Sequence, residues 1–558
     1  MHPNYRTVAG TMAAMLLAAL SAGAAAGVVS GSVTDSGGQA VAGAIVTLTD
    51  ERGVAESVYT DTKGTYKLSS KLAGELDLRF RKRYHKDDVR HLKLGASQKA
   101  AINVKLTTLT DAKELSEDHP SLSHFARINF DKNPKARFSR ENFSRDCLTC
   151  HQLGNIATRL PRPPNGWLPS VQRMHGYLVN TDADFIKARA ELLEKSFDGA
   201  IVTSQPRVPT DPLLAKAKIY QWRLAGANVP HDAAAHSGNN KIYTVDMFAG
   251  MVIETDLKTG KTLSFQEPAQ GMPPGGAFTK MGAPAPYGLT VPRAPHSLAE
   301  GKDGNFYLTD SIGASIGIFN PTTKEFAHYE VGGGAVYPHT VRVDKAGIVW
   351  ATMAFSNQVA RFDPVTKDMK VIKLPDNKPD GMSCCVVPYG IDVGPEDGGI
   401  WYTKLFADKI GRIDPKTLEI KEYDSPVVGP RRHRFDAKGH LWVVGFSDGS
   451  IAKIDVKTWK STVYKLPVFA TGEVPAPYAV AVHPKTQEIW VNDTMMDVAW
   501  RFLPKEERFV AYPLPLKGTY TRDFTFPKEG WACTSNNPIP PTALEGGVPE
   551  LICIDAGT

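Results

Sequence analysis

Alternating apolar and polar positions dominate this sequence and predict many short β-strands. Near the N-terminus, residues 44–48 (AIVTL) and 101–106 (AINVKL) have strand length and strand pattern, with turn residues between them. Side chains of a strand point alternately to its two faces, so each of these segments can bury one face in a core. Residues 27–109 are therefore predicted to form a small β-sandwich.

From residue 213 to the end, the strand pattern repeats at a spacing of about 40–50 residues. The clearest units join an aromatic-plus-Thr strand to a turn with Arg, Asp and Pro: 349–352 (VWAT) with 360–364 (ARFDP), and 400–403 (IWYT) with 411–415 (GRIDP). Related strands complete a set of seven units and centre on Tyr243, Tyr307, Trp442, Trp490 and Trp531. Such repeats are typical of β-propellers. Residues 213–558 are thus predicted to be a seven-bladed propeller, and the protein to be mainly β.

The last repeat supplies too few strands for a complete blade. Residues 218–224 (KIYQWRL) come before the first full repeat and have the pattern of an outer strand. They can complete the final blade and close the ring, which removes an exposed edge.

Two family resemblances support these predictions. The repeats resemble the streptogramin lyase (virginiamycin B lyase) family from about Val229 to Asp555, and the turns at 31–35, 41–44 and 60–66 resemble the carboxypeptidase regulatory-like domain. The first resemblance implies a propeller with a His- and acid-lined magnesium site that opens a cyclic ester by elimination. The second implies an accessory module. Only Glu300 stands near a matched His position, so this chain departs from the lyase pattern.

Residues 110–212 join the two β regions and contain the motif Cys147-Leu148-Thr149-Cys150-His151. This is the attachment sequence of c-type haem, in which two thiols bond to the porphyrin and the adjacent imidazole ligates the iron. A zinc or redox C-x-x-C is the alternative. The adjacent His favours one covalent haem c, held by a short α-helical cytochrome c segment.

The sixth iron ligand is predicted from the residues that follow. Residues 166–174 (GWLPSVQRM) resemble cytochrome c domains, in which a Trp precedes an axial Met, and this makes Met174 the predicted ligand. His175 is the competitor, although on a helix it would point to a different side. A thioether ligand raises the reduction potential, which suits an acceptor of electrons from a substrate.

Aligned residues at the start of the innermost strands predict a ring around the propeller axis. The ring consists of His231, His296, His339, Tyr389, Arg431, Tyr478 and Tyr520. Imidazoles there can bind a second metal or transfer protons, Arg can hold an anion, and phenols can position a substrate. The alternative is a set of polar plugs in a water-filled channel. His433 and Arg522, two residues further along equivalent strands, are predicted to point the same way.

Composition and charge indicate which classes of partner the protein is expected to bind. The 558 residues are 42% hydrophobic and 22% charged, with a formal net charge of +6. These values are those of a globular protein, and neither nucleic acid nor a membrane span in the mature chain is expected. Residues 1–26 read as an export signal with an apolar stretch and small residues before Gly27; a membrane anchor is the alternative. The mature protein is predicted to be periplasmic.

The remaining cysteines fit an oxidising compartment. Cys533 and Cys553 lie in adjacent predicted strands and are expected to form a disulfide. For the neighbours Cys384 and Cys385, a strained disulfide, metal-binding thiolates and inert thiols all stay open.

These features together predict a periplasmic haem c oxidoreductase. A small-molecule substrate would react at the propeller axis, and electrons would pass through the haem to or from a periplasmic partner. Two alternatives remain: a haem-bearing electron-transfer protein whose propeller docks a partner, and a metal-dependent lyase like the propeller's relatives.

Overall fold

The computed structural model describes residues 26–130, 139–177, 182–204, 207–378, 385–537 and 544–557. The predicted export signal lies outside this part of the chain except for its last residue, and Cys384 lies outside it as well. No helix among the described residues is long and apolar enough to cross a membrane.

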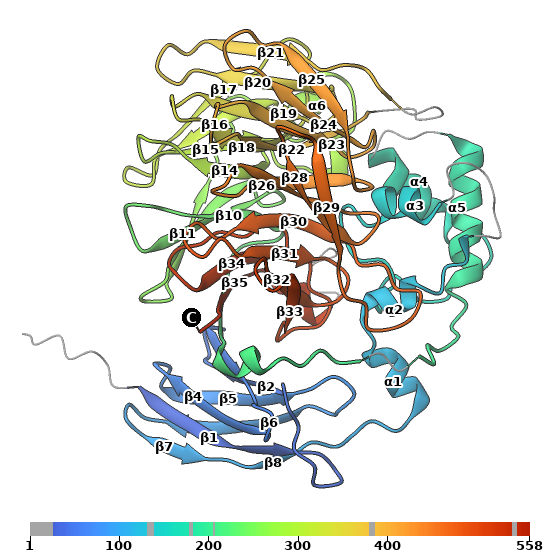
Figure 1. The fold of residues 1–558 in the computed structure, drawn as a ribbon, viewed down its shortest axis with the longest axis vertical. Helices are drawn as coiled ribbons and strands as arrows, with labels where there is room; N and C mark the ends of the chain where they lie inside the picture. The colour runs from blue at the N-terminus through green and yellow to red at the C-terminus, as the bar shows by residue number, and fades with distance from the viewer. Residues whose placement is uncertain are drawn as a thin grey trace, which may run out of the picture.

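Eight strands form the N-terminal β-sandwich, seen at the bottom of Figure 1. They are β1 (Gly27–Thr34), β2 (Ile45–Thr49), β3 (Ala55–Tyr59), β4 (Thr65–Ser70), β5 (Gly74–Arg81), β6 (Asp88–Leu94), β7 (Lys99–Ala101) and β8 (Val104–Lys105). One sheet has the order β4-β1-β7, with β8 also paired to β1, and the other runs β3-β2-β5-β6. Val29, Val46, Leu78 and Phe80 are buried in the core of the sandwich, as the alternating pattern predicts.

Six consecutive four-stranded sheets follow, in each of which the strands pair in chain order. The first three sheets contain β10 (Pro230–Ala235), β11 (Lys241–Asp246), β12 (Met251–Asp256) and β13 (Thr262–Gln266); β14 (Pro295–Glu300), β15 (Phe306–Asp310), β16 (Ser315–Phe319) and β17 (Phe326–Glu330); β18 (Pro338–Val343), β19 (Val349–Met353), β20 (Gln358–Phe362) and β21 (Met369–Lys373). The next three contain β22 (Pro388–Val393), β23 (Ile400–Lys404), β24 (Lys409–Ile413) and β25 (Ile420–Asp424); β26 (Pro430–Phe435), β27 (His440–Gly445), β28 (Ser450–Asp455) and β29 (Lys460–Lys465); β30 (Pro477–Val482), β31 (Ile489–Asp493), β32 (Val498–Leu503) and β33 (Arg508–Pro513).

The first strands of these sheets lie against one another. Contacts run in order from β10 through β14, β18, β22 and β26 to β30. Each first strand begins with Pro and has its first four residues buried, whereas an outer strand such as β17 is only half-buried. The sheets therefore surround a common axis, as in a β-propeller, and lie side by side in Figure 1.

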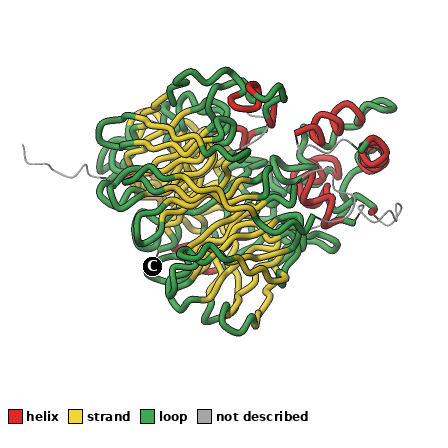
Figure 2. The backbone as a smooth tube through the Cα atoms, turned by 90° about the horizontal axis from the view of Figure 1, so that it is seen from above, coloured by secondary structure: helices red, strands yellow, loops and turns green. Residues whose placement is uncertain are grey.

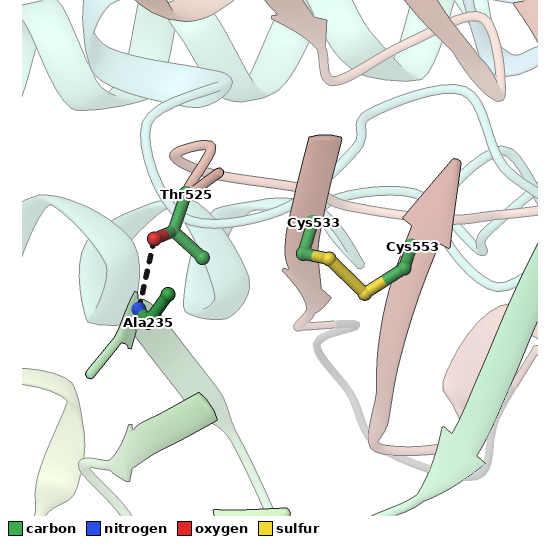
Figure 3. The surroundings of a disulfide bond; sticks show 4 residues. All are labelled: Ala235, Thr525, Cys533 and Cys553. Carbon is green, nitrogen blue, oxygen red and sulfur yellow. Dashed lines mark hydrogen bonds between the residues drawn. A yellow bond between two sulfur atoms is a disulfide. The ribbon is translucent and has the colours of Figure 1, made fainter. Parts of the chain in front are cut away.

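A composite sheet joins the two ends of this array. β9 (Lys218–Arg223) pairs antiparallel with β35 (Glu550–Asp555), and β35 pairs with β34 (Trp531–Asn536). β34 contacts β10 of the first sheet. Cys533 and Cys553 stand opposite each other on β34 and β35 and form a disulfide, shown in Figure 3. β9 thus completes the last sheet, as its strand pattern predicts.

The sandwich extends this composite sheet further. The outer edge of β9 pairs antiparallel with β3, which places Ala55 opposite Gln221 and Val58 opposite Lys218. The result is one sheet of seven strands in the order β34-β35-β9-β3-β2-β5-β6. The strand pattern predicts two separate modules, but the structure joins them because an unpaired strand edge of one is covered by the other.

Helices cover one side of the sheets, as Figures 1 and 2 both show. The main ones are α1 (Ala112–Asp118), α2 (Ser121–Phe125), α3 (Arg140–Cys147), α4 (Leu168–Tyr177) and α5 (Ala183–Ser196). Short turns of helix elsewhere are η2 (Pro212–Lys216), α6 (Gly276–Lys280), η3 (Pro286–Gly288) and η4 (Glu545–Gly547). Phe143, Trp167 and Phe197 share one apolar cluster with Leu289 and Phe446 of the propeller, so the helical segment packs directly on the sheets.

Candidate functional site

The C-x-x-C-H motif lies where α3 ends and the chain turns toward the propeller. Cys147 is the last residue of α3, and Cys147 and Cys150 both have free thiols. A cavity of about 370 Å³ lies beside them, and its lining includes Cys147, Cys150, His151, Trp167, Met174 and Leu193. The side chains predicted to attach and ligate haem therefore share one largely apolar cavity.

Burial keeps the side chains of the motif in their neutral forms. It raises the pKa of Cys147 to about 12 and also raises the pKa of Cys150. His151 Nδ1 lies 2.8 Å from the carbonyl oxygen of Gln152, which holds the ring proton on Nδ1 and leaves Nε2 for a metal. Burial lowers the pKa of His151, so the imidazole is neutral, as a ligand must be.

Met174 and His175 both line this cavity from α4. The His175 ring packs edge-on against Phe185, with 5.7 Å between ring centroids, and His175 Nε2 lies 3.3 Å from Arg189 Nη1. Both contacts are to α5. His175 is already engaged there, which favours Met174 as the side chain available to a sixth coordination position.

The predicted axial residues lie together as one continuous cluster. The ring centroids of His231 and His296 are 3.6 Å apart, and those of His296 and His339 are 4.1 Å apart. The ring centroids of His339 and Tyr389 are 3.9 Å apart, and the Tyr389 hydroxyl lies 2.7 Å from the hydroxyl of Tyr478. Tyr478 in turn lies 6.4 Å from His231, so these side chains close a ring around the axis.

The three axial imidazoles are neutral, and the ring protons of two of them are fixed in position. Burial, reinforced by neighbouring positive groups, lowers the pKa of His296 to about 3 and holds the pKa values of His231 and His339 well below their usual range. His231 Nδ1 lies 2.9 Å from Asp232 Oδ1, and His296 Nδ1 lies 3.0 Å from the His339 carbonyl oxygen. Because both partners are acceptors, each Nδ1 carries the proton and each Nε2 keeps a lone pair.

Three buried arginines surround Tyr478. The guanidinium carbons of Arg431, Arg522 and Arg432 lie 3.8, 5.0 and 5.4 Å from the centre of its ring. Burial alone would raise the pKa of Tyr478, but these three cations outweigh burial and lower it. The sequence prediction includes Arg431 and considers Arg522 but omits Arg432. The run Arg431-Arg432-His433-Arg434 in an inner strand could have drawn attention to it. His433 lies elsewhere, with Nε2 at 3.2 Å from the carbonyl oxygen of Trp401.

Two members of the axial ring hold the C-x-x-C-H motif. Arg431 Nη2 donates to the carbonyl oxygen of Thr149 at 3.0 Å, and the Tyr520 hydroxyl donates to that of Leu148 at 2.7 Å. Leu148 and Thr149 are the residues between the two cysteines. The motif is therefore docked on the mouth of the propeller axis.

A second, smaller cavity of about 40 Å³ lies at this junction. Its polar lining includes His231, His296, His339, Tyr389 and Arg522. It shares Cys150, Phe248 and Tyr287 with the larger cavity. Arg431, Tyr478 and Tyr520 stand behind this lining and support it, so the seven predicted axial residues divide into cavity-facing and supporting groups.

Comparison with known proteins matches two separate regions of the chain. Residues 275–502 match the model of the Virginiamycin B lyase family, and residues 28–107 match that of the Carboxypeptidase regulatory-like domain. The first region contains His296, His339, Tyr389, Arg431 and Tyr478, and neither region contains 147–151. Among curated proteins, none matches the chain.

Solved structures similar to this chain include two lyases. One is described as a streptogramin B lyase; it is 18% identical, with a TM-score of 0.49 over 61% of this chain and 97% of its own. The other is virginiamycin B lyase from Staphylococcus aureus, which is 17% identical, with a TM-score of 0.48 over 61% of this chain and 99% of its own.

Acidic metal ligands gather away from the axis. Among the described residues, the one group of three His, Cys, Asp or Glu side chains close enough to share an ion is Glu267, Asp310 and His328. Arg293 Nη1 already donates to Asp310 at 2.7 Å and supplies a positive charge there. The three axial imidazoles form a row rather than a triangle, and a second metal at the axis stays a prediction.

Proposed function

We propose that this protein is a haem c oxidoreductase in which a small substrate reacts at the propeller axis and electrons leave through a haem attached at Cys147 and Cys150. The observation that carries the proposal is the docking of the C-x-x-C-H motif on the axial ring through Arg431 and Tyr520. Because Cys150 lines both cavities, a haem bonded to it would lie next to the axial cavity.

The residues around the larger cavity fit this group. His151 and Met174 would hold the iron, and the apolar Trp167 and Leu193 would cover the porphyrin. When bound, haem c supplies one-electron transfer. The chain's own residues bind the substrate, exclude water and accept its proton, the last at an Nε2 of the neutral axial imidazoles. A periplasmic electron acceptor or donor would complete the cycle, since one haem carries one electron at a time.

The architecture and location follow the same proposal. We count the composite sheet of β34, β35 and β9 as the seventh blade, with the inner segment Thr519–Thr525 bridged to β34. The disulfide between Cys533 and Cys553 suits an exported protein in an oxidising compartment.

A lyase is the second candidate, and the match of residues 275–502 to the Virginiamycin B lyase family favours it. Elimination needs a base that removes a proton and a group that stabilises the developing negative charge. The neutral imidazoles and Arg522 could fill these roles without a haem.

One set of measurements separates the two candidates. The purified holo-protein is mixed with candidate substrates while the haem absorption and the product are followed together. The oxidoreductase predicts that substrate reduces the haem, and that His296→Asn slows this reduction without loss of haem. Metal-dependent turnover with an unchanged haem spectrum would instead establish the lyase.

A further inference from the structure

Two buried guanidinium groups beside the axial cavity have no carboxylate partner among the described residues. Arg432 shows the usual arrangement, with Asp232 at 2.9 Å and Asp523 at 3.0 Å. Arg431 and Arg522, by contrast, bond to neutral oxygens: Arg431 to the Thr149 carbonyl and Arg522 Nη1 to the Tyr478 hydroxyl at 2.7 Å. Both arginines are at most 4% exposed.

These two positive charges cannot be removed by deprotonation, since arginine stays protonated in proteins. A buried charge without a counter-charge is costly. Two tyrosine hydroxyls are bonded to this pair, that of Tyr389 to Arg431 and that of Tyr478 to Arg522. Burial raises the pKa of Tyr389, whereas the surrounding arginines lower that of Tyr478, so loss of the Tyr478 proton could balance one of the two charges. One positive charge is left for an anion from outside the chain.

Arg522 is the cation that an anion could reach. It lines the axial cavity, whereas Arg431 is turned toward Thr149 and Tyr389. No Asp or Glu is among the described residues that line this cavity. Within this part of the chain, Nη1 is the Arg522 nitrogen that has a hydrogen-bond partner, so the guanidinium retains donors for a ligand.

Two of the imidazoles that line the cavity can accept a hydrogen bond from a hydroxyl group. Both His231 and His296 line the cavity, and they use Nδ1 to bond Asp232 and the His339 carbonyl. This leaves Nε2 of each ring as the acceptor for a ligand. Such nitrogens pair with a ligand O–H and can take its proton. The volume of about 40 Å³ limits the ligand to a few heavy atoms.

We infer that the axial cavity binds a small hydroxycarboxylate of glycolate size, with its carboxylate on Arg522 and its hydroxyl against Nε2 of His231 or His296. The inference rests on the proposed function, because it names the substrate class of the same site.

Calorimetric titration of the full-length holo-protein with three probes tests the inference. Glycolate has both groups, acetate lacks the hydroxyl, and glycolamide lacks the charge. Glycolate is expected to bind at least about tenfold more tightly than either of the others. Arg522→Gln should remove at least about tenfold of the glycolate affinity, and Arg522→Lys should remove less.

Arg501→Gln is the matched control, because Arg501, in β32, is also buried but bonds Glu488, away from the axis. It should leave glycolate binding unchanged, and thermal unfolding of each variant shows that it folds. Equal affinity for glycolamide and glycolate, or for wild type and Arg522→Gln, would overturn the inference. So would an Arg522→Gln variant that shifts the haem potential while glycolate binds neither protein, since Arg522 would then pair with haem carboxylates.

These outcomes are distinct from failure of the proposed function. Selective glycolate binding without haem reduction by any substrate would leave the inference standing and remove the oxidoreductase. Haem reduction by a neutral or cationic substrate, with no glycolate binding, would support the oxidoreductase and overturn the inference.

Discussion

The hydroxyl of Tyr520 donates a hydrogen bond to the carbonyl oxygen of Leu148, with 2.7 Å between the two oxygens. These residues are 372 positions apart in the chain, and both are 1% exposed. Tyr520 comes from the axial ring and Leu148 from between the two cysteines. The propeller therefore sets the position of the C-x-x-C-H motif, and each cavity is placed relative to the other.

Loss of the docking bonds should loosen this junction. Tyr520→Phe leaves the buried Leu148 carbonyl without its donor, which should cost about 1–3 kcal/mol of unfolding free energy. Arg431→Gln should cost at least as much, because Arg431 contacts both Thr149 and Tyr389. Urea unfolding measures both. Tyr464→Phe removes an exposed hydroxyl bonded to Glu507 and serves as control; an equal loss there would argue against a special docking role.

Haem attachment should depend on both thiols of the motif. The double variant Cys147→Ala with Cys150→Ala should lose covalent haem, because each thiol supplies one thioether link. Haem staining after denaturing electrophoresis and the mass of the protein give the readout. Thr149→Ser keeps both thiols and should retain the haem. Normal staining of the double variant would exclude the predicted attachment.

The sixth ligand can be assigned by comparing two neighbours on α4. Met174→Ala should remove a thioether ligand, change the reduced spectrum and lower the reduction potential. His175→Ala should leave both close to those of the wild type, since His175 is engaged with Arg189 and Phe185. Potentiometric titration of the holo-proteins measures the change, and the opposite result would transfer the assignment to His175.

Acid should destabilise the protein through the axial histidines. The pKa of His296 is about 3 in the folded chain, against 6.5 as its ordinary value, so between these values the unfolded chain binds a proton that the folded chain does not. The contribution of each such histidine to stability should be greatest above pH 6.5 and fall by about 1.4 kcal/mol for each pH unit below it. Urea unfolding at several pH values measures the slope. His296→Asn should reduce the slope, and an unchanged slope would show that His296 takes its proton in the folded state.

Removal of the disulfide should weaken the composite sheet. Cys533 and Cys553 are 20 residues apart, and a cross-link of this span contributes about 3 kcal/mol by constraining the unfolded chain. The double variant Cys533→Ser with Cys553→Ser should unfold at correspondingly lower urea. The wild type under reducing conditions should behave in the same way, and an unchanged midpoint in both would show that the strand pairing alone suffices.

Contiguous or periodic features of the sequence anticipate much of the structure. The strand repeats lead to the successive sheets, the outer-strand pattern of 218–224 leads to the pairing of β9 with β35, and alignment of inner strands brings His231, His296 and His339 together. These relationships follow from repetition, which one sequence can display.

Other features depend on contacts between unlike segments. The sequence around Arg431 and Tyr520 does not predict that these side chains bond the backbone at 148–149. That contact depends on how α3 packs on the propeller. The pairing of β9 with β3 cannot be predicted from the sequence either, because the residue pattern of an edge strand does not specify which strand will pair with it. The strand alignment does not single out Arg432, because this residue acts through an ion pair with Asp232 of another sheet.

The continuous sheet from β34 to β6 also has a mechanical meaning. β9 is the strand that ties the start of the propeller to its end, and β3 is bonded along its free side. A force applied to the sandwich would be transmitted through the backbone hydrogen bonds between β3 and β9. Tension on the sandwich would therefore reach the pairing of β9 with β35, where the propeller closes.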